Sequence, residues 1–307
     1  MKNVLEWLEA TVAKYPDKPA FSDTESSITF RQVYDIARNT GAYLVEQLGV
    51  DRTPIAVFAG RKMVTPAYFL GVVYAGRPYA PIDASLPDKR IEKILENLCP
   101  GAIVADRESR EHVESIVDEL AKAEGFDRPQ IFIAEDISRF EQVACADSNC
   151  KISESAGDAV TDSENDIDGG VVAGCAGKTD DSSRDMLAVV RRQMSMTDPL
   201  YIIYTSGSTG NPKGVMTSHL SLMTYINAYC DVMHIEESDV LGNQSPLDYI
   251  AAIRDIYLPL KTGCSTAIIP KEYFMEPNAL FDYMNEKKVS SVGWSVSAFT
   301  ILTSLGA

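Results

Sequence analysis

The residues best suited to chemistry form one short segment, "TSGSTGNPKG" at positions 205–214. Its hydroxyl side chains can donate hydrogen bonds to phosphate oxygens, and its lysine adds a fixed positive charge. Its glycines allow consecutive backbone N–H groups to converge on an anion. The same residue types also form plain surface turns. Because the segment directly follows the apolar run "YIIY" at 201–204, we expect a polyphosphate-binding loop.

The spacing of this segment excludes the Walker A loop, G-x-x-x-x-G-K-[ST]. Counted from Gly207, the residue before Lys213 is Pro212, where the motif requires glycine. Gly214 stands where the motif requires serine or threonine. The segment is therefore not the phosphate loop of a P-loop NTPase.

Short apolar runs alternate with longer amphipathic stretches on both sides of the segment. Runs such as "IAVFA", "YAPID", "AIVAD" and "LYIIYT" predict buried strands, and Ile91, Ile94, Leu95 and Leu98 have helical spacing. This alternation indicates an α/β fold of two doubly wound, mainly parallel sheets with helices on both faces. We expect one α/β subdomain over residues 1–198 and a second, truncated one, which carries the loop, over 199–307.

One segment of the first subdomain breaks the pattern. Residues 145–185 are rich in Ser, Asp, Gly and Ala, so they bury too little apolar area to offset the entropy of ordering. We expect a disordered acidic insertion here. The alternative is a docking loop for a basic partner.

The composition limits the partners and the compartment. The chain of 307 residues has 28 Lys and Arg against 44 Asp and Glu, a formal charge of −16, which repels nucleic acid and anionic membranes. Neither a secretion signal nor an apolar run of membrane-spanning length is present, so we expect a cytoplasmic protein. The six cysteines form no Cys-x-x-Cys pair, and those at 145, 150 and 175 have no histidine nearby, so we expect free thiols and no metal site.

Taken together, several segments resemble the adenylate-forming superfamily of acyl-CoA synthetases, luciferases and peptide-synthetase adenylation domains. The ten residues at 205–214 match its signature phosphate loop, and residues 28–44, 70–91 and 214–222 resemble its neighbouring motifs in the expected order. The pattern "GRPYAPID" at 76–83 is closer to amino-acid-activating members, including D-alanyl carrier protein ligases, than to fatty acyl-CoA ligases. The resemblance covers nearly the whole chain outside the insertion.

The resemblance implies a reaction and a set of site residues. A small carboxylic acid would react with ATP and Mg²⁺ to give an acyl-adenylate and pyrophosphate, and the acyl group would then pass to a carrier protein or to the CoA thiol. Lys213 and Thr205 are the candidate catalytic residues. The expected phosphate cradle comprises Thr205, Ser206, Gly207, Ser208, Thr209, Gly210 and Lys213. His219 matches a frequent family histidine, and a purely structural hydrogen bond is the alternative.

The resemblance also places a substrate pocket, where this chain departs from its amino-acid-activating relatives. Aligning Asp255-Ile256-Tyr257 with the family's Asp-Ile-Tyr puts Ile250 where those relatives carry the aspartate that binds the α-amino group. Burying an unpaired ammonium is costly, so we expect an acid without an α-amino group, unless Asp248 replaces the anchor. The other expected pocket residues are Ala251, Arg254 and Gly293. Arg254 would pair either with a second substrate carboxylate or with a surface acid.

The family's later motifs are absent from these 307 residues, including its threonine-glutamate motif, its ribose-binding aspartate and its C-terminal domain. We therefore expect this chain alone to be incompetent for the full reaction. Two hypotheses follow. The chain is the N-terminal portion of an adenylate-forming ligase, or it is an inactive adenylation-like remnant that binds a ligand or partner.

Overall fold

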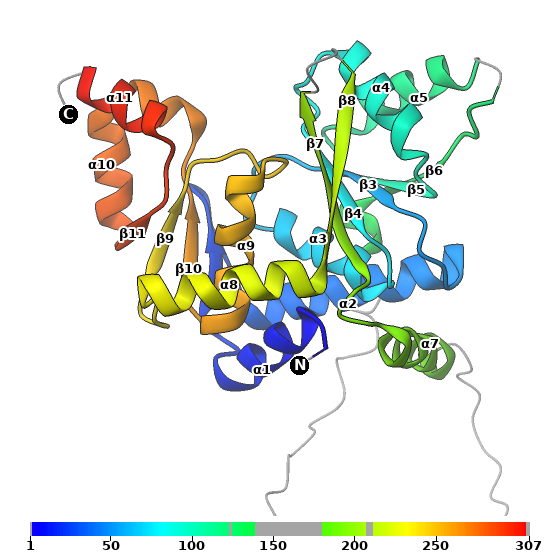
Figure 1. The fold of residues 1–307 in the computed structure, drawn as a ribbon, viewed down its shortest axis with the longest axis horizontal. Helices are drawn as coiled ribbons and strands as arrows, with labels where there is room; N and C mark the ends of the chain where they lie inside the picture. The colour runs from blue at the N-terminus through cyan, green and yellow to red at the C-terminus, as the bar shows by residue number, and fades with distance from the viewer. Residues whose placement is uncertain (1, 123–124, 139–179, 207–210, 305–307) are drawn as a thin grey trace, which may run out of the picture.

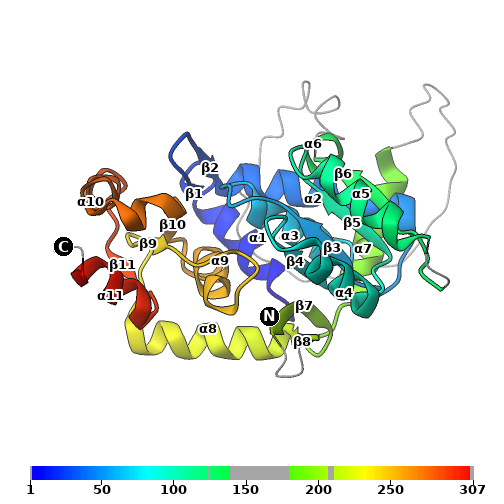
Figure 2. The ribbon, with the colours of Figure 1, turned by 90° about the horizontal axis from the view of Figure 1, so that it is seen from above.

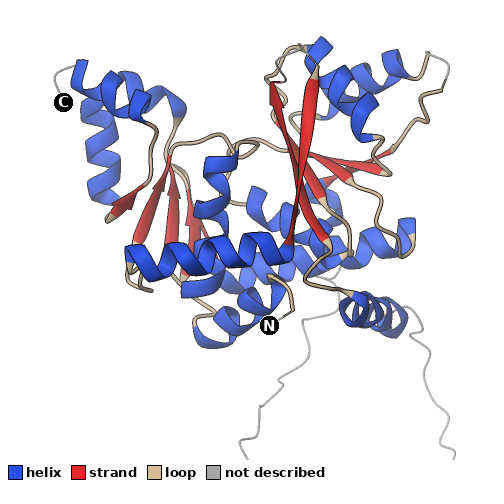
Figure 3. Ribbon diagram, in the orientation of Figure 1, coloured by secondary structure: helices blue, strands red, loops and turns tan. Residues whose placement is uncertain are grey.

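A computed structural model of the chain describes residues 2–122, 125–138, 180–206 and 211–304. Its strands form two separate sheets, one of five strands and one of six (Figure 1). Figure 3 shows the two groups of strands side by side with helices packed around them. The predicted α/β class with two mainly parallel sheets is confirmed.

The five-stranded sheet is parallel except at one edge. Only β1 and β2 pair in the antiparallel sense, and the other neighbours are parallel. In spatial order its strands are β11 (Ser291–Val292), β9 (Val240–Asn243), β10 (Ser265–Ile268), β1 (Pro19–Ser22) and β2 (Ser27–Thr29).

The six-stranded sheet also ends in one antiparallel pair, here β7 with β8. Its other neighbours run parallel, with β3 at the centre between β5 and β4. In spatial order its strands are β6 (Gln130–Ile133), β5 (Ala102–Ala105), β3 (Ile55–Phe58), β4 (Tyr79–Ile82), β7 (Pro199–Ser206) and β8 (Pro212–Ser218).

Helices cover both faces of the six-stranded sheet. Side chains of α2 (Phe30–Leu48) and α3 (Thr65–Tyr74) bury one face, together with residues of β3 such as Ile55 and Val57. The alternate β3 residues, Ala56 and Phe58, lie in a second cluster with α4 (Asp88–Leu98) and α5 (Arg110–Leu120). This alternation follows from the two-residue period of a strand.

The remaining helices are α1 (Leu5–Lys14), α6 (Ala134–Ile137), α7 (Asp180–Gln193), α8 (His219–Met233), α9 (Ile250–Thr262), the 3₁₀ helix η1 (Lys271–Met275), α10 (Pro277–Glu286) and α11 (Val296–Ser304). Of these, α6 and α7 pack against α2, and the others lie around or lead to the five-stranded sheet. Seen from above, α8 runs along one edge of the molecule, from the end of β8 to the five-stranded sheet (Figure 2). Between the sheets, the buried hydroxyls of Tyr79 on β4 and Tyr257 on α9 lie 3.1 Å apart.

Two expected boundaries differ from the structure. The sheets do not follow the division at residue 198, since β1 and β2 belong with β9–β11, and β7 and β8 belong with β3–β6. The pairing Phe21↔Thr266 joins residues far apart in sequence, which a local pattern does not reveal. The expected insertion lies mostly outside the described residues, and its last six residues, 180–185, belong to α7.

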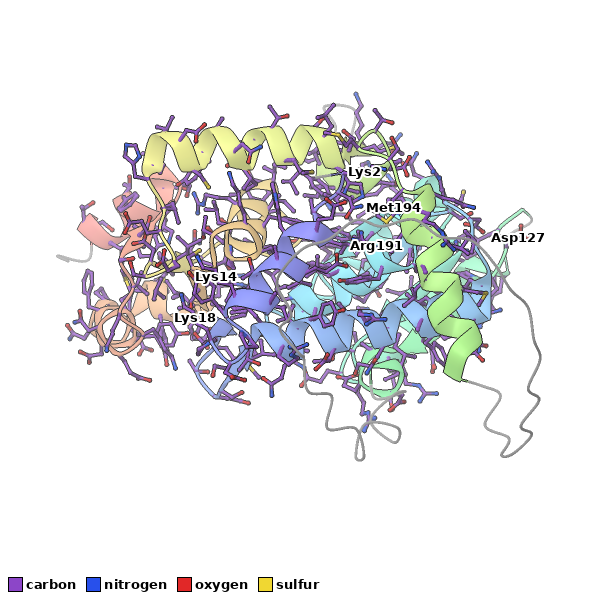
Figure 4. All side chains as sticks on the ribbon, turned by 90° about the horizontal axis from the view of Figure 1, so that it is seen from below. Lys2, Lys14, Lys18, Asp127, Arg191 and Met194 are labelled. Atoms are coloured by element: carbon purple, nitrogen blue, oxygen red, sulfur yellow. The ribbon has the colours of Figure 1, made fainter. Side chains whose placement is uncertain are left out.

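An arginine near the end of α7 fixes this helix to the start of the chain. Arg191 forms an ion pair with Glu9 of α1 at 2.9 Å and donates a hydrogen bond to Asn3 Oδ1 at 2.5 Å. Figure 4 shows Arg191 and Met194 on the side of α7 that faces the body of the molecule.

Within the described residues, none of the helices combines the length and apolarity needed to cross a membrane.

Candidate functional site

The expected phosphate loop lies at the tip of the β7–β8 hairpin. Thr205 pairs with Lys213 across the hairpin, and the Thr205 hydroxyl donates to the Lys213 carbonyl oxygen at 3.5 Å. Ser206 pairs with Pro212. Thr205, Ser206 and Lys213 are all exposed, so they are brought together and open to solvent. The other predicted cradle residues, Gly207, Ser208, Thr209 and Gly210, lie outside the described residues.

Helix α4 supports this hairpin from the side. The Tyr204 hydroxyl donates to Asn97 Oδ1 at 2.8 Å, and Lys93 Nζ donates to Asn211 Oδ1 at 3.3 Å. Local pattern does not predict these contacts, because Lys93 and Asn97 lie on the exposed, polar side of an amphipathic helix.

Gly214 has a different role from the one expected for a loop glycine. It lies within β8 and is absent from the residues with positive φ, so no left-handed conformation requires it. A Cβ atom there would lie 2.9 Å from Ile202 Cγ2 and 3.1 Å from Tyr204 Cζ. Gly214 is therefore needed for close packing within the hairpin, not for a turn.

The second expected region lies beyond the carboxyl ends of β9 and β11. Strand β9 comes first in the chain. The next strand, β10, lies on one side of it, and the strand after that, β11, lies on the other side. Loops diverge at such a switch point, which is where open α/β sheets bind ligands. Gly293 follows β11, and α9 begins at Ile250 shortly after β9. The four predicted pocket residues therefore lie around this switch point, three of them on α9 and Gly293 after β11.

The pocket residues differ in exposure. Ile250 is the first residue of α9, and 53% of its surface is exposed. Ala251 is half-buried beside it. Arg254 lies one turn further along the same side of the helix, and only 11% of its side chain is exposed.

The Arg254 guanidinium is bound within the chain. Its Nε and Nη2 atoms lie 2.7 and 2.6 Å from Asp255 Oδ1, and its Nη1 donates to the Gly293 carbonyl oxygen at 3.3 Å. It also lies over the Tyr229 ring, 5.5 Å from the centroid. A Cβ on Gly293 would lie 1.6 Å from Nη1, so the absence of a side chain there makes room for the guanidinium. The acid that pairs with Arg254 is thus an interior neighbour, not a surface residue.

Asp255 anchors this polar cluster. Its other carboxylate oxygen accepts from Asn243 Nδ2 at 3.0 Å, and its carbonyl oxygen accepts from the Thr266 hydroxyl at 2.6 Å. Burial opposes the charge of Arg254, but the Asp255 carboxylate outweighs it and raises the pKa of the guanidinium. The site therefore contains a compensated ion pair instead of a free cation. The motifs used for the prediction did not include Asn243 or Tyr229, which reach the site from β9 and α8.

Asp248, the alternative amine anchor, lies apart from the Arg254 cluster. It lines a small cavity with Arg61, Asp83 and Leu247. Burial and the nearby charge of Asp83 raise the pKa of the Asp248 carboxyl above its ordinary value. None of the hydrogen bonds recorded for the described residues joins Asp248 to Arg254.

His219 is the first residue of α8 and is almost fully buried. Its Nδ1 accepts a hydrogen bond from the Val4 N–H at 3.4 Å, which connects α8 to the start of α1. Burial lowers the pKa of the imidazole to about 4. Of the two interpretations of this residue, the geometry favours the structural one.

Acid should destabilise the fold through His219. The folded pKa of about 4 lies below the ordinary value of about 6.5, so the unfolded chain binds the proton more tightly. This contribution is intact above pH 6.5 and is lost as the pH falls toward 4, by roughly 3 kcal/mol in total. Urea unfolding of the wild type and of His219→Gln at pH 7.5, 6 and 5 measures it. The variant should show the shallower slope. Equal slopes for the wild type and His219→Gln would contradict this role of His219.

Among the residues that the structure describes, no group of three or more His, Cys, Asp or Glu is placed to hold a metal ion. The cysteines at 145, 150 and 175 lie outside this part of the chain, whereas Cys99, Cys230 and Cys264 are free thiols. A metal at the hairpin would therefore be held by hydroxyls, water and the ligand's own oxygens.

Known proteins resemble this chain in sequence and fold. The D-alanine–D-alanyl carrier protein ligase of Bacillus licheniformis is 27% identical over 284 residues, covering 91% of this chain and 46% of the ligase. The chain thus spans about half the length of this curated relative. A four-domain nonribosomal peptide synthetase bound to AMP and glycine has a TM-score of 0.69 at 18% identity, covering 98% of this chain and 18% of its own. The AMPPNP-bound synthetase FmoA3 has a TM-score of 0.70 at 19% identity, covering 99% of this chain and 26% of its own.

The sequence profile described as AMP-binding enzyme matches residues 8–306, which is nearly the whole chain. The match includes the β7–β8 hairpin and the crevice between β9 and β11. The chain belongs to the family of AMP-binding enzymes.

Proposed function

We propose that the chain activates a carboxylic acid with ATP, forming an acyl-adenylate and releasing pyrophosphate, and serves a ligase that passes the acyl group to a thiol. The observation that carries this proposal is the pairing of Thr205 with Lys213 at the exposed tip of the β7–β8 hairpin. It places a hydroxyl donor and a fixed cation together at the predicted phosphate loop. Family membership and the resemblance to carrier protein ligases support the same reaction.

The reaction explains why a cation and hydroxyls are needed. A carboxylate oxygen attacks the α-phosphorus of ATP, the bond to the β-phosphate oxygen breaks, and pyrophosphate leaves with its electron pair. Lys213 neutralises the charge that develops on the pyrophosphate, while Thr205 and Ser206 donate hydrogen bonds to its oxygens. Gly207, Ser208, Thr209 and Gly210 complete the proposed cradle. A thiol then attacks the acyl carbon and displaces AMP.

Mg²⁺ fits this site as a companion of the ATP phosphates. Mg²⁺ prefers oxygen ligands, keeps several waters and is commonly bound through substrate phosphates, and the hairpin offers the hydroxyls of Thr205 and Ser206. It would supply charge neutralisation on the phosphate oxygens. We therefore propose ATP and Mg²⁺ as the requirements of the reaction.

The crevice beyond β9 and β11 is the proposed acid pocket, lined by Ile250, Ala251, Arg254 and Gly293. Ile250 offers no charge to an ammonium, and Arg254 is already paired with Asp255. The polar cluster therefore favours neither an amino acid nor a second carboxylate. We propose a small monocarboxylic acid without an α-amino group. The thiol acceptor is proposed to be a carrier protein or CoA, and the site of action the cytoplasm.

The test is acid-dependent exchange of labelled pyrophosphate into ATP, using the product of the complete reading frame. The panel pairs each amino acid with its 2-hydroxy and unsubstituted analogues, at equal concentration. Exchange should be fastest with an amine-free acid. Exchange confined to the amino acids would contradict the proposed substrate class, and folded protein that exchanges with no acid would contradict the proposed function.

The comparisons do not support the alternative of an inactive remnant.

A further inference from the structure

The six-stranded sheet has a switch point of its own, which the proposed function leaves unused. The chain places β4 on one side of β3 and then β5 on the other. The loops after β3 and β5 therefore diverge at one point of the sheet edge, where open α/β sheets generally bind ligands. In the five-stranded sheet the corresponding point is the proposed acid pocket.

A cavity of about 510 Å³ lies at this second switch point. Its walls come from both sheets. They are residues 23–26 between β1 and β2, residues 61–64 after β3, Glu108 after β5, and residues 268–272 at the end of β10 and the start of η1. Cavities of this volume commonly hold small organic molecules.

Arg61 is the unusual group in the cavity wall. Its Nε is buried and has no hydrogen-bond partner, and its Nη2 reaches only the backbone and side-chain oxygens of Asn243, both at 3.4 Å. In the part of the chain that the structure describes, no carboxylate lies within ion-pair distance of its guanidinium. Burial lowers the pKa of the Arg61 guanidinium. The nearby charges of Glu272 and Asp83 act to raise it, but more weakly. An anionic partner would stabilise a half-buried cation that has no ion pair.

Two acids of the wall, Asp23 and Glu108, are already engaged. Asp23 accepts hydrogen bonds from the backbone N–H groups of Glu25, Ser26 and Met63 at 3.0 to 3.2 Å. Glu108 pairs with Lys62 at 3.0 Å. Glu25, Lys271 and Glu272 are exposed. Arg61 differs from these three in being partly buried, with a buried Nε that has no partner among the described residues.

The rest of the wall is suited to an apolar body. Ile268 and Ile269 are buried side chains, and Met63, Val64 and Pro270 add further apolar surface. A guanidinium binds carboxylate and phosphate oxygens in the same bidentate geometry. An anionic head on Arg61 would place its hydrocarbon part against these side chains.

We propose that this cavity binds a small organic anion, with a carboxylate or phosphate head on the Arg61 guanidinium and an apolar body along residues 268–270. The cavity wall includes none of the residues of the β7–β8 hairpin and none of the four expected acid-pocket residues. It meets the Arg254–Asp255 cluster through Asn243, which Arg61 and Asp255 both contact. Its ligand would therefore be a second molecule, bound at the same time as the substrates.

The test uses the ¹⁵N-labelled chain and three probes, which are sodium butyrate, butyl phosphate and inorganic phosphate, each titrated at constant ionic strength. NMR signals of the arginine Nε–H groups and of the backbone amides of residues 61–64, 269, 271 and 272 report on binding. We expect saturable shifts of the Arg61 Nε–H, with butyrate or butyl phosphate binding more tightly than inorganic phosphate because of the apolar wall. Equal binding by all three probes, or no saturable shift at Arg61, would overturn the proposal.

Variants make the assignment specific. Arg61→Gln should weaken the tightest probe at least about tenfold, since a charged hydrogen bond contributes about 1.5–3 kcal/mol. Because it removes an unpaired cation, it should leave the thermal midpoint unchanged or higher. Arg61→Lys, which keeps the charge without the bidentate edge, should bind weakly as well. Arg110→Gln, at an exposed arginine paired with Glu114, should bind like the wild type. Wild-type affinity in folded Arg61→Gln would refute the site.

Discussion

Lys213→Ala is expected to slow acid-dependent pyrophosphate exchange by about 100-fold, the usual cost of removing one group that stabilises transition-state charge. Lys213 is exposed at the hairpin tip, opposite Thr205, so its removal leaves the packing of β7 and β8 intact. The loss should therefore appear in the exchange rate and not in the thermal midpoint. Exchange kinetics with the product of the complete reading frame measure it.

Lys122→Ala is the matched control for this prediction. Lys122 is also exposed and pairs with Glu119 at the end of α5, outside the hairpin. Its removal should change the exchange rate less than twofold. If Lys213→Ala exchanged as fast as Lys122→Ala, the hairpin would not be the phosphate cradle.

Asp255→Ala should be among the most destabilising single substitutions in the chain. The carboxylate is buried, and it compensates Arg254, whose side chain is also largely buried. Removing one partner leaves the other charge uncompensated in the interior, which costs about 3–5 kcal/mol. Asn243 and Arg254 would lose their acceptor as well. Urea unfolding monitored by circular dichroism measures the change in the free energy of unfolding.

An exposed ion pair provides the comparison. Asp118 pairs with Arg128 at 2.8 Å, and about half or more of each side chain is exposed to solvent. Asp118→Ala should cost less than about 1 kcal/mol, because solvent screens exposed charges. A similar small cost for Asp255→Ala would show that the Arg254–Asp255 pair does not hold the crevice together.

Local periodicity predicted the elements of this fold well. Ile91, Ile94, Leu95 and Leu98, which set the helical spacing of α4, are all buried in the structure. The apolar run of β7 is buried likewise. Both patterns report burial against a neighbouring layer, which is a property of the segment itself.

The assembly of these elements could not be predicted in the same way. Strand β8 contains proline, glycine and lysine, residues typical of a loop, and it becomes a strand only because β7 supplies its hydrogen bonds. The sharing of each sheet between the two halves of the chain depends on contacts such as Phe21↔Thr266. Local sequence carries no information on such pairings.

The candidate site shows the same limit. Composition made Thr205 and Lys213 candidates, because hydroxyls and a cation in a glycine-rich segment suit phosphate oxygens. The partner of Arg254 was not predicted, although Asp255 is its neighbour in sequence, because the direction of the guanidinium depends on Gly293 and Tyr229 from other elements. Arg61 carried no motif at all, and only its burial beside a cavity distinguishes it.

Attack of the carboxylate on the α-phosphorus of ATP can be followed with an isotope label. An acid with ¹⁸O in its carboxylate is incubated with ATP, Mg²⁺ and the product of the complete reading frame, with hydroxylamine as the acceptor. Breaking the acyl carbon–oxygen bond then leaves one carboxylate oxygen on the nucleotide. The account predicts ¹⁸O in AMP and unlabelled pyrophosphate by mass spectrometry. Label in orthophosphate together with ADP would show attack at the γ-phosphorus and would contradict it.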